Sequence, residues 1–262
     1  MPLLHEKRGQ ISILTFSNPE RRNAWHEDYW SALLEIMPKL ERDADTRCVV
    51  ITGDEKGRAF CAGADLKDER AHSLSSLGEF VESLAESRRL SPFELIGDFA
   101  KPTIAAVNGY AIGIGAILTF CCDLVVASEQ AEWRLPQASL GILPAAGASA
   151  RLSRWIGKGN AMRMALGFPF TAQDAQRAGL AQWLVPPEEL MTHAGELAAQ
   201  IAALPPLSAR LTKESLNYGV NLPLPYAALG DMYRFALLEM TEDKSEAHEA
   251  WRERRKPLFR GR

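Results

Sequence analysis

Two glycine-containing turns in the sequence could present backbone N–H groups to an anion. In one, the apolar run at residues 103–107 leads to Gly113 and Gly115, at the start of an apolar helical stretch. The first N–H groups of a helix have no acceptor within it, so they can bind a negative oxygen. In the other, the small residues within 60–66 follow a predicted strand and would let a second backbone come close. Two converging amides would form an oxyanion hole, although tight packing of a strand against a helix also explains a Gly-x-Gly turn.

The composition is that of an ordinary folded protein without an affinity for polyanions. Of the 262 residues, 47% are hydrophobic and 24% are charged, which is typical of a chain that folds compactly. The 30 Lys and Arg residues against 33 Asp and Glu residues give a formal net charge of -3. Such a balance creates no field that would attract nucleic acid or an anionic membrane. We therefore expect neither of them as a partner.

The cysteines and the N-terminal residues indicate a reducing compartment. The four cysteines lack the paired spacing of a zinc site, and three of them lie in apolar stretches where a buried thiol is expected. Residues 1–8 contain no apolar core long enough for a secretory signal. The longest apolar run, 111–122, is shorter than the roughly 20 residues of a membrane span. We expect a cytoplasmic protein without a metal site.

The hydrophobic patterns predict strands alternating with helices. Runs at 11–16, 48–52 and 103–107 are typical of strands, and the last two are apolar throughout, as in strands buried on both faces. A helical pattern covers 27–42, in which Pro38 should kink the helix or restart it. Helices between buried strands indicate an α/β fold.

The second half of the chain is mainly helical by the same criterion. Pro205-Pro206 is the best boundary, and it divides a unit at 1–204 from a helical region at 205–262. The charged segment 67–99 also has helical spacing, and it could cover a site or be a plain surface helix. The further helical patterns lie at 161–166, 172–178, 190–203, 209–218 and 226–239.

Several separated blocks together resemble one family. The blocks are Arg21-Arg22-Asn23-Ala24 and residues 62–66, 101–115, 140–144 and 171–186. In this order they resemble the enoyl-CoA hydratase/isomerase (crotonase) family over essentially the whole chain. The resemblance implies a spiral of ββα turns with a helical C-terminal trimerisation region, in a homotrimer or a dimer of trimers. It also implies an acyl-CoA thioester substrate and no tightly bound cofactor, since coenzyme A is part of the substrate.

The resemblance assigns the two anion-binding amides. Members of this family stabilise a thioester enolate with two backbone N–H donors, which correspond by position to Ala64 and Ile114. In other enzymes, loss of one such donor costs about 3–4 kcal/mol of transition-state stabilisation. The family usually has glycine where Ile114 stands. The amide is retained, but a β-branched side chain restricts the backbone and narrows the pocket.

The resemblance also implies contacts with coenzyme A from both ends of the chain. Arg21 and Arg22 correspond to a basic position beside a turn, and the planar arginine fork suits phosphate. Trp251 and Arg254 resemble residues that complete the site, often across a subunit boundary, although a basic tail can also be a solvated helix end. The implied residues are Arg21, Arg22, Ala24, Ala62, Asp65, Leu66, Trp251 and Arg254.

The acidic residues of the family's hydratases are missing here. Their two glutamate positions fall at Ile117 and Gln137, and an aspartate position of the dienoyl-CoA isomerases falls at Ala145. A positioned acid or base contributes about 10²–10⁴-fold to the rate. Gln137 can orient a water or bond a substrate oxygen, but it cannot carry a proton at neutral pH. Possible replacements, each of which could instead be a surface or helix-end residue, are His26, Asp68, Glu69 and His72.

Three functions are therefore open. We favour an acyl-CoA lyase or isomerase of the enoyl-CoA hydratase/isomerase type, with its proton-transfer group elsewhere in the chain. The second is a reaction that needs the enolate site but little acid–base catalysis, such as decarboxylation of a carboxyacyl-CoA or carbon–carbon cleavage. An apolar wall at Ile117 would favour loss of carbon dioxide by desolvating the carboxylate. The third is a non-catalytic acyl-CoA-binding protein.

Overall fold

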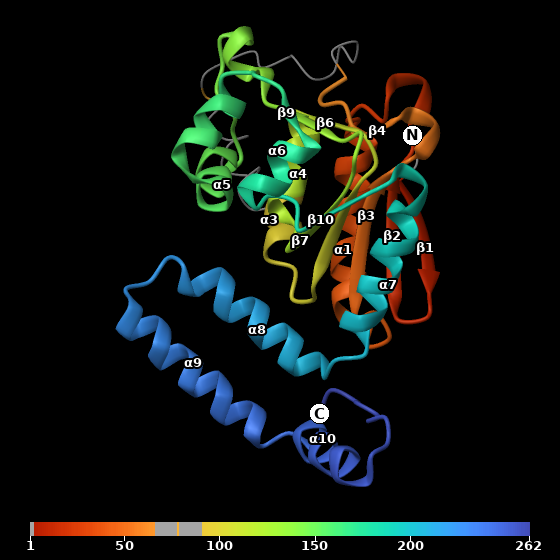
Figure 1. Ribbon diagram of the computed structural model, residues 1–262, viewed down its shortest axis with the longest axis vertical. Helices are drawn as coiled ribbons and strands as arrows, with labels where there is room; N and C mark the ends of the chain where they lie inside the picture. Colours follow the sequence, from red (N-terminus) through yellow and green to blue (C-terminus); the bar gives the residue numbers. More distant parts are fainter. Residues whose placement is uncertain (1–2, 66–77, 79–90) are drawn as a thin grey trace.

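A large, mostly parallel sheet forms the centre of the molecule (Figure 1). The computed structural model describes residues 3–65, 78 and 91–262. Within them, this sheet has six strands in the order β1-β2-β3-β5-β7-β10, and only β1 is antiparallel to its neighbour. The strands are β1 (Leu3–Arg8), β2 (Ile11–Phe16), β3 (Cys48–Gly53), β5 (Thr103–Val107), β7 (Leu124–Ser128) and β10 (Trp183–Val185).

The central strands are buried on both faces, as their apolar runs predict. Every residue of β3 and β5 is buried. On one face, Val50 and Ile104 pack with the helix α7 (Leu190–Ala202). On the other face, Ile51 and Ala105 belong to the main core together with residues of α1 (Glu27–Arg42). The predicted α/β fold is confirmed.

A second, smaller sheet positions the candidate site. Its strands within the described chain are β4 (Ala59–Cys61), β6 (Tyr110–Ile112), β8 (Glu132–Arg134) and β9 (Phe170–Thr171), paired in that order. The chain passes from the large sheet to the small one three times, as β3–β4, β5–β6 and β7–β8. β6 then leads into α4 (Ile114–Cys121), and β8 leads through a short 3-10 helix into α5 (Ala148–Ala165). This repeated ββα path is the expected spiral.

Some helices differ from the expectation. Of the two effects expected of Pro38, the restart does not occur, because α1 is continuous from Glu27 to Arg42, with the buried Met37 and Leu40 on either side of the proline. α5 starts much earlier than the pattern at 161–166, because the non-helical Gly157 interrupts its periodicity. A helix that the sequence analysis missed, α10 (Glu242–Glu253), is highly charged and buries only two residues. Apart from two helices near the C-terminus, the other helices of the described residues are α3 (Pro92–Gly97), α6 (Ala172–Ala178) and the 3-10 helices η1 (Pro19–Arg21), η2 (Glu55–Gly57), η4 (Pro136–Leu140) and η5 (Pro187–Glu189).

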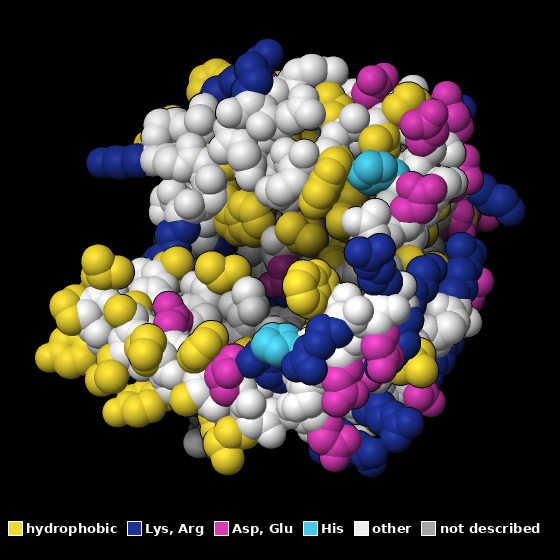
Figure 2. Space-filling view, turned by 60° about the horizontal axis from the view of Figure 1, so that its bottom comes forward, with side chains coloured by type: hydrophobic (Ala, Val, Ile, Leu, Met, Phe, Trp, Pro, Cys, Tyr) yellow, Lys and Arg dark blue, Asp and Glu magenta, His cyan; other side chains and the backbone are white. Residues whose placement is uncertain are grey.

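The last helices form an arm that projects from the body of the molecule (Figure 1). In the arm, α8 (Pro206–Gly219) packs against α9 (Leu224–Glu239), and none of the residues of α9 is buried. Hydrophobic side chains gather on this arm (Figure 2). Monomeric proteins rarely expose so continuous an apolar surface. The large exposed hydrophobic side chains are Leu216, Tyr218, Val220, Leu222, Leu224, Tyr226, Leu229, Met232, Tyr233, Phe235, Leu237 and Met240.

Candidate functional site

The two glycine turns are in backbone contact. A Cβ atom added to Gly63 would lie 3.0 Å from the carbonyl oxygen of Ile112, and one added to Gly113 would lie 3.9 Å from the Cα of Gly63. A Cβ atom at Gly115 would be only 2.0 Å from the carbonyl oxygen of Cys61. The segment after β4 and the start of α4 therefore meet through residues that have no side chain, which is why glycine is needed there.

Backbone pairing orients the first predicted donor, the N–H of Ala64. The Trp25 N–H donates to the carbonyl of Gly63 at 2.7 Å, and the Asp65 N–H donates to the carbonyl of Trp25 at 3.1 Å. Because this parallel bridge uses the groups on either side of Ala64, the N–H of Ala64 points away from Trp25. The second donor belongs to Ile114, the first residue of α4, where helix N–H groups lack an intrahelical acceptor. That both donors meet one oxygen stays a prediction.

Gln137, in η4, lies beside the same junction. A Cβ atom at Gly113 would lie 3.6 Å from its Nε2 atom. Its Oε1 atom is buried and has no hydrogen-bond partner within the part of the chain that the structure describes. Its backbone carbonyl accepts a hydrogen bond from the Ile142 N–H at 3.0 Å. A buried amide oxygen without a partner is uncommon in proteins, and a substrate or water can supply the missing hydrogen bond.

The other two positions at which the sequence analysis expects replaced acids, Ile117 and Ala145, hold no group that could transfer a proton. Ile117, one turn into α4, is 3% exposed and packs in the main core. Ala145 is exposed in the loop that precedes α5. His26 caps α1, where its Nδ1 atom accepts a hydrogen bond from the Asp28 N–H at 3.2 Å. The three remaining candidates, Asp68, Glu69 and His72, lie outside the described residues.

Most of the residues predicted to bind coenzyme A are brought together around the turn after β2. Arg21 forms an ion pair with the carboxylate of Asp65, whose side chain is 6% exposed. The Ala62 N–H donates to the carbonyl of Arg22 at 3.2 Å. Arg21 and Arg22 themselves are exposed. The residues brought together are Arg21, Arg22, Ala24, Ala62 and Asp65, whereas Leu66 lies outside the described residues.

The two C-terminal residues predicted to bind coenzyme A are not part of this cluster. Trp251 is 82% exposed on α10, and Arg254 ends that helix in the left-handed conformation with φ 55°. In Figure 1, α10 lies at the opposite end of the molecule from β4, the strand that precedes Ala64 in the chain. A single chain therefore does not bring Trp251 or Arg254 to the glycine turns.

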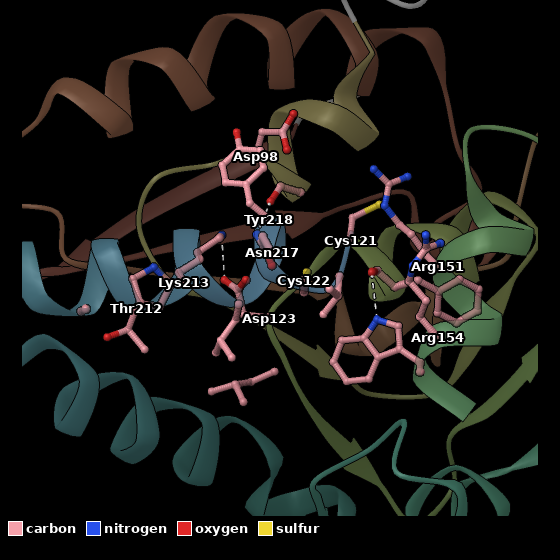
Figure 3. A pocket seen from close by; sticks show the side chains of 18 of the residues that line it. Asp98, Cys121, Cys122, Asp123, Arg151, Arg154, Thr212, Lys213, Asn217 and Tyr218 are labelled. Carbon is pink, nitrogen blue, oxygen red and sulfur yellow. Dashed lines mark hydrogen bonds and ion pairs between the residues drawn. The ribbon is translucent and has the colours of Figure 1, made fainter. Parts of the chain in front are cut away.

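A cavity of about 910 Å³ lies elsewhere, between the arm and the body of the molecule (Figure 3). Its walls come from α3, the end of α4, α5 and α8, and none of the predicted site residues that the structure describes lines it. Lys213 of α8 reaches across to Asp123, with 2.7 Å between Nζ and Oδ2. Burial raises the pKa of the Asp123 carboxyl group. The positive charge of the neighbouring Lys213 opposes this rise, but the pKa stays above its usual value.

No local sequence signal pairs Asp123 with a cation. Its Oδ2 atom accepts a hydrogen bond from the backbone N–H of Thr103, 20 residues earlier in the chain, at 2.7 Å. Lys213, in contrast, is 90 residues further along the chain, as the two residue numbers show. A single lysine on an amphipathic helix carries no signal of burial.

The four cysteines are buried, free thiols of low reactivity. Burial raises the pKa of Cys61 to about 12, so its thiol is protonated at neutral pH and is a poor nucleophile. Among the described residues there is no group of three or more His, Cys, Asp or Glu side chains that could hold a metal ion. No described helix is both long enough and apolar enough to cross a membrane.

Known proteins share this sequence and fold over nearly their whole length. A family model described as Enoyl-CoA hydratase/isomerase matches residues 6–262. The 2,3-dehydroadipyl-CoA hydratase of Escherichia coli is 35% identical over 261 residues, which are 99% of this chain and 99% of that protein. The short-chain-enoyl-CoA hydratase of Clostridium acetobutylicum is 33% identical over 257 residues, covering 96% of this chain and 94% of that protein.

The solved structures lead to the same family. The crystal structure of an enoyl-CoA hydratase from Bacillus anthracis matches with a TM-score of 0.90 at 30% identity, covering 99% of both chains. An enoyl-CoA hydratase subunit from Geobacillus kaustophilus matches with a TM-score of 0.88 at 33% identity, covering 99% of this chain and 98% of that one. Sequence blocks, backbone architecture and full-length similarity agree, and the chain belongs to the enoyl-CoA hydratase/isomerase (crotonase) family.

Proposed function

We propose that this protein converts an acyl-CoA thioester through an enolate, whose oxygen is bound by the backbone N–H groups of Ala64 and Ile114. The observation that carries this proposal is the backbone contact between the turns at Gly63 and Gly113, with Gln137 beside them. Donors that are already in place stabilise a developing negative charge without reorganisation, and one such donor is worth about 3–4 kcal/mol. The positive end of the α4 dipole adds to this effect.

The reaction that this site supports best is hydration, dehydration or isomerisation of an enoyl thioester. The similar proteins include hydratases that are named for 2,3-dehydroadipyl-CoA and for short-chain enoyl-CoA. In this chain the Gln137 amide would hold a water or a substrate oxygen, but it would not exchange a proton. The proton-transfer group is then another side chain. Among the described residues the candidate is His26, and the other candidates are Asp68, Glu69 and His72, which lie outside the described residues.

The coenzyme A part of the substrate would lie along the turn that Arg21 and Arg22 expose. Their guanidinium groups would pair with its phosphates, and the segment 62–66 would contact the remainder. Trp251 and Arg254 could complete this site only from another copy of the chain, because α10 lies at the far end of the molecule. Coenzyme A would enter as part of the substrate, without a tightly bound cofactor.

This arrangement requires an oligomer, for which we propose a homotrimer or a dimer of trimers. The exposed apolar side chains of α8 and α9 support an interface on the arm. Both helices lie beyond Pro205, where we place the division between the spiral core and the helical region. Burial of apolar surface contributes roughly 25 cal/mol of favourable free energy per Å², and this gain would drive association.

Decarboxylation of a carboxyacyl-CoA is the second candidate, because Ile117 stands where a hydratase carries an acid. Its side chain is apolar and 3% exposed. A carboxylate that is placed against such a wall would lose hydration, which favours release of carbon dioxide and leaves an enolate for the same two amides. This reaction needs less acid–base catalysis than hydration.

The test is to assay the wild-type protein with crotonyl-CoA for hydration and with methylmalonyl-CoA for decarboxylation. We expect slow hydration, and about 10–100-fold faster hydration by Gln137→Glu, because the variant restores a carboxylate beside the junction. Gln173→Glu, on the exposed surface of α6, is the matched control and should change nothing. Faster carbon dioxide release than hydration would favour the second candidate.

Two other outcomes would contradict the proposal. If coenzyme A thioesters bind but none is converted, the protein is a non-catalytic binding protein. If millimolar thioester leaves the melting temperature unchanged, the binding claim itself is wrong, because ligand at 100 times its Kd should stabilise the fold by about 2.7 kcal/mol.

A further inference from the structure

Arg151, in the first turn of α5, joins the end of the loop before this helix to α3. Its Nη1 atom donates to the carbonyl of Ala146 at 2.8 Å, and its Nη2 atom donates to the carboxylate of Glu94 in α3 at 2.6 Å. The side chain lies at one end of the cavity (Figure 3). A Cβ atom at Gly147 would be 2.7 Å from Nη1, so the guanidinium occupies the space that glycine leaves open.

The loop 141–147, which Arg151 holds, leads directly from Gln137. Ala146 and Gly147 have φ values of 53° and 70°, in the left-handed region that alanine adopts only at a cost. At the other end of the loop, the Ile142 N–H donates to the carbonyl of Gln137 at 3.0 Å. One end of the loop is therefore bonded to Gln137, and the other end is held by Arg151.

We propose that Arg151 is a positioning residue, which keeps Gln137 beside Gly113 by tying the strained end of this loop to α3. The inference rests on the proposed function. Stability alone does not account for the arrangement, because the Glu94 side chain is 42% exposed and ion pairs at such sites add little to stability. The bond to Ala146 is different, since it fixes a backbone conformation that Ala146 does not favour by itself.

Loss of Arg151 should then affect the chemical step more than substrate binding. The coenzyme A contacts that we propose at Arg21 and Arg22 belong to the turn after β2, and Arg151 does not touch them. A shift of about 1 Å in a group next to the reacting atoms can lower the rate about 100-fold. We therefore expect kcat to fall while KM stays nearly constant.

The experiment compares Arg151→Met with Arg163→Met, a control on the same helix. Arg163 also bonds one carbonyl and one carboxylate, those of Pro169 at 3.0 Å and Asp174 at 2.9 Å. We expect Arg151→Met to lower kcat for the thioester by about 10–100-fold with KM within about threefold of wild type, and Arg163→Met to leave both nearly unchanged. Arg151→Lys should have a kcat between those of wild type and Arg151→Met. Its ammonium group can still donate a hydrogen bond, but it lacks the planar fork that bonds two partners at once.

The outcomes separate this inference from the proposed function. A wild-type protein that converts no thioester overturns both. If the wild type is active and Arg151→Met keeps its kcat, or loses no more than Arg163→Met, only the positioning role is wrong. Should Arg151→Met fail to fold, Arg151→Lys decides, because unchanged kcat or an increase in KM alone would refute the role.

Discussion

Gly63→Ala is a direct test of the contact on which the oxyanion hole depends. Gly63 has a φ of +91°, and an added Cβ atom would lie 3.0 Å from the carbonyl oxygen of Ile112. That separation is tighter than ordinary van der Waals contact, so the two backbones must separate by a few tenths of an ångström. Ala64 is the next residue, and its N–H would move with the backbone.

The expected effect has two parts of different size. A side chain at positive φ costs about 1–2 kcal/mol of stability through backbone strain. Displacement of the Ala64 N–H weakens one of two donors, and complete loss of such a donor costs about 10²–10³-fold in kcat. A displacement of a few tenths of an ångström removes only part of that, so we expect kcat to fall by about 10–100-fold.

Gly179→Ala separates strain from displacement. Gly179 ends α6 with a φ of +82° and has no atom within 4 Å of the position of its Cβ. The melting temperatures of both variants should lie below that of the wild type by a similar amount. Only Gly63→Ala should lose turnover of the thioester that the wild type converts. Equal kcat values for the two variants would refute the reasoning, because the loss would then have nothing to do with the contact at Ile112.

Three further predictions concern stability and reactivity. Lys213→Met leaves the buried Asp123 without its cation and should cost about 3–5 kcal/mol in calorimetry, whereas a cost below about 1 kcal/mol would show that the pair is dispensable. Burial raises the pKa of Asp174, but hydrogen bonds from Arg163 and Arg177 outweigh this effect and lower the pKa from 3.8 to about 2. Ionised Asp174 thus stabilises the fold above about pH 4, and the gap in melting temperature between wild type and Asp174→Asn should shrink as pH falls toward 2, while a constant gap would contradict this. Because burial raises the pKa of all four thiols, a thiol reagent at neutral pH should modify none in the folded protein and four after unfolding; rapid modification in the folded state would disprove the burial.

Local sequence signals predicted the strands and the turns of the site. The mainly apolar runs at 48–52 and 103–107 identified buried strands, because a strand that is covered on both faces has apolar side chains on both of them. Gly63 and Gly113 indicated the turns in the sequence. Glycine is needed at both positions, because each has a positive φ value and lies where two backbones come close together. Helix α10 escaped prediction, because a charged helix with two buried residues has almost no hydrophobic period.

The sequence alone determined which chemical groups this protein has. It contains two glycine turns, which we predict to bind an oxyanion, and it has Ile117, Gln137 and Ala145 at the positions where the family resemblance predicts acids. These properties are local, since residue type and short-range spacing set them. The tertiary structure decided which distant residues meet. It paired Lys213 with Asp123 and Arg151 with Glu94, and it placed α10 away from the turns. Such contacts depend on how helices dock in three dimensions, and no short-range pattern encodes that docking.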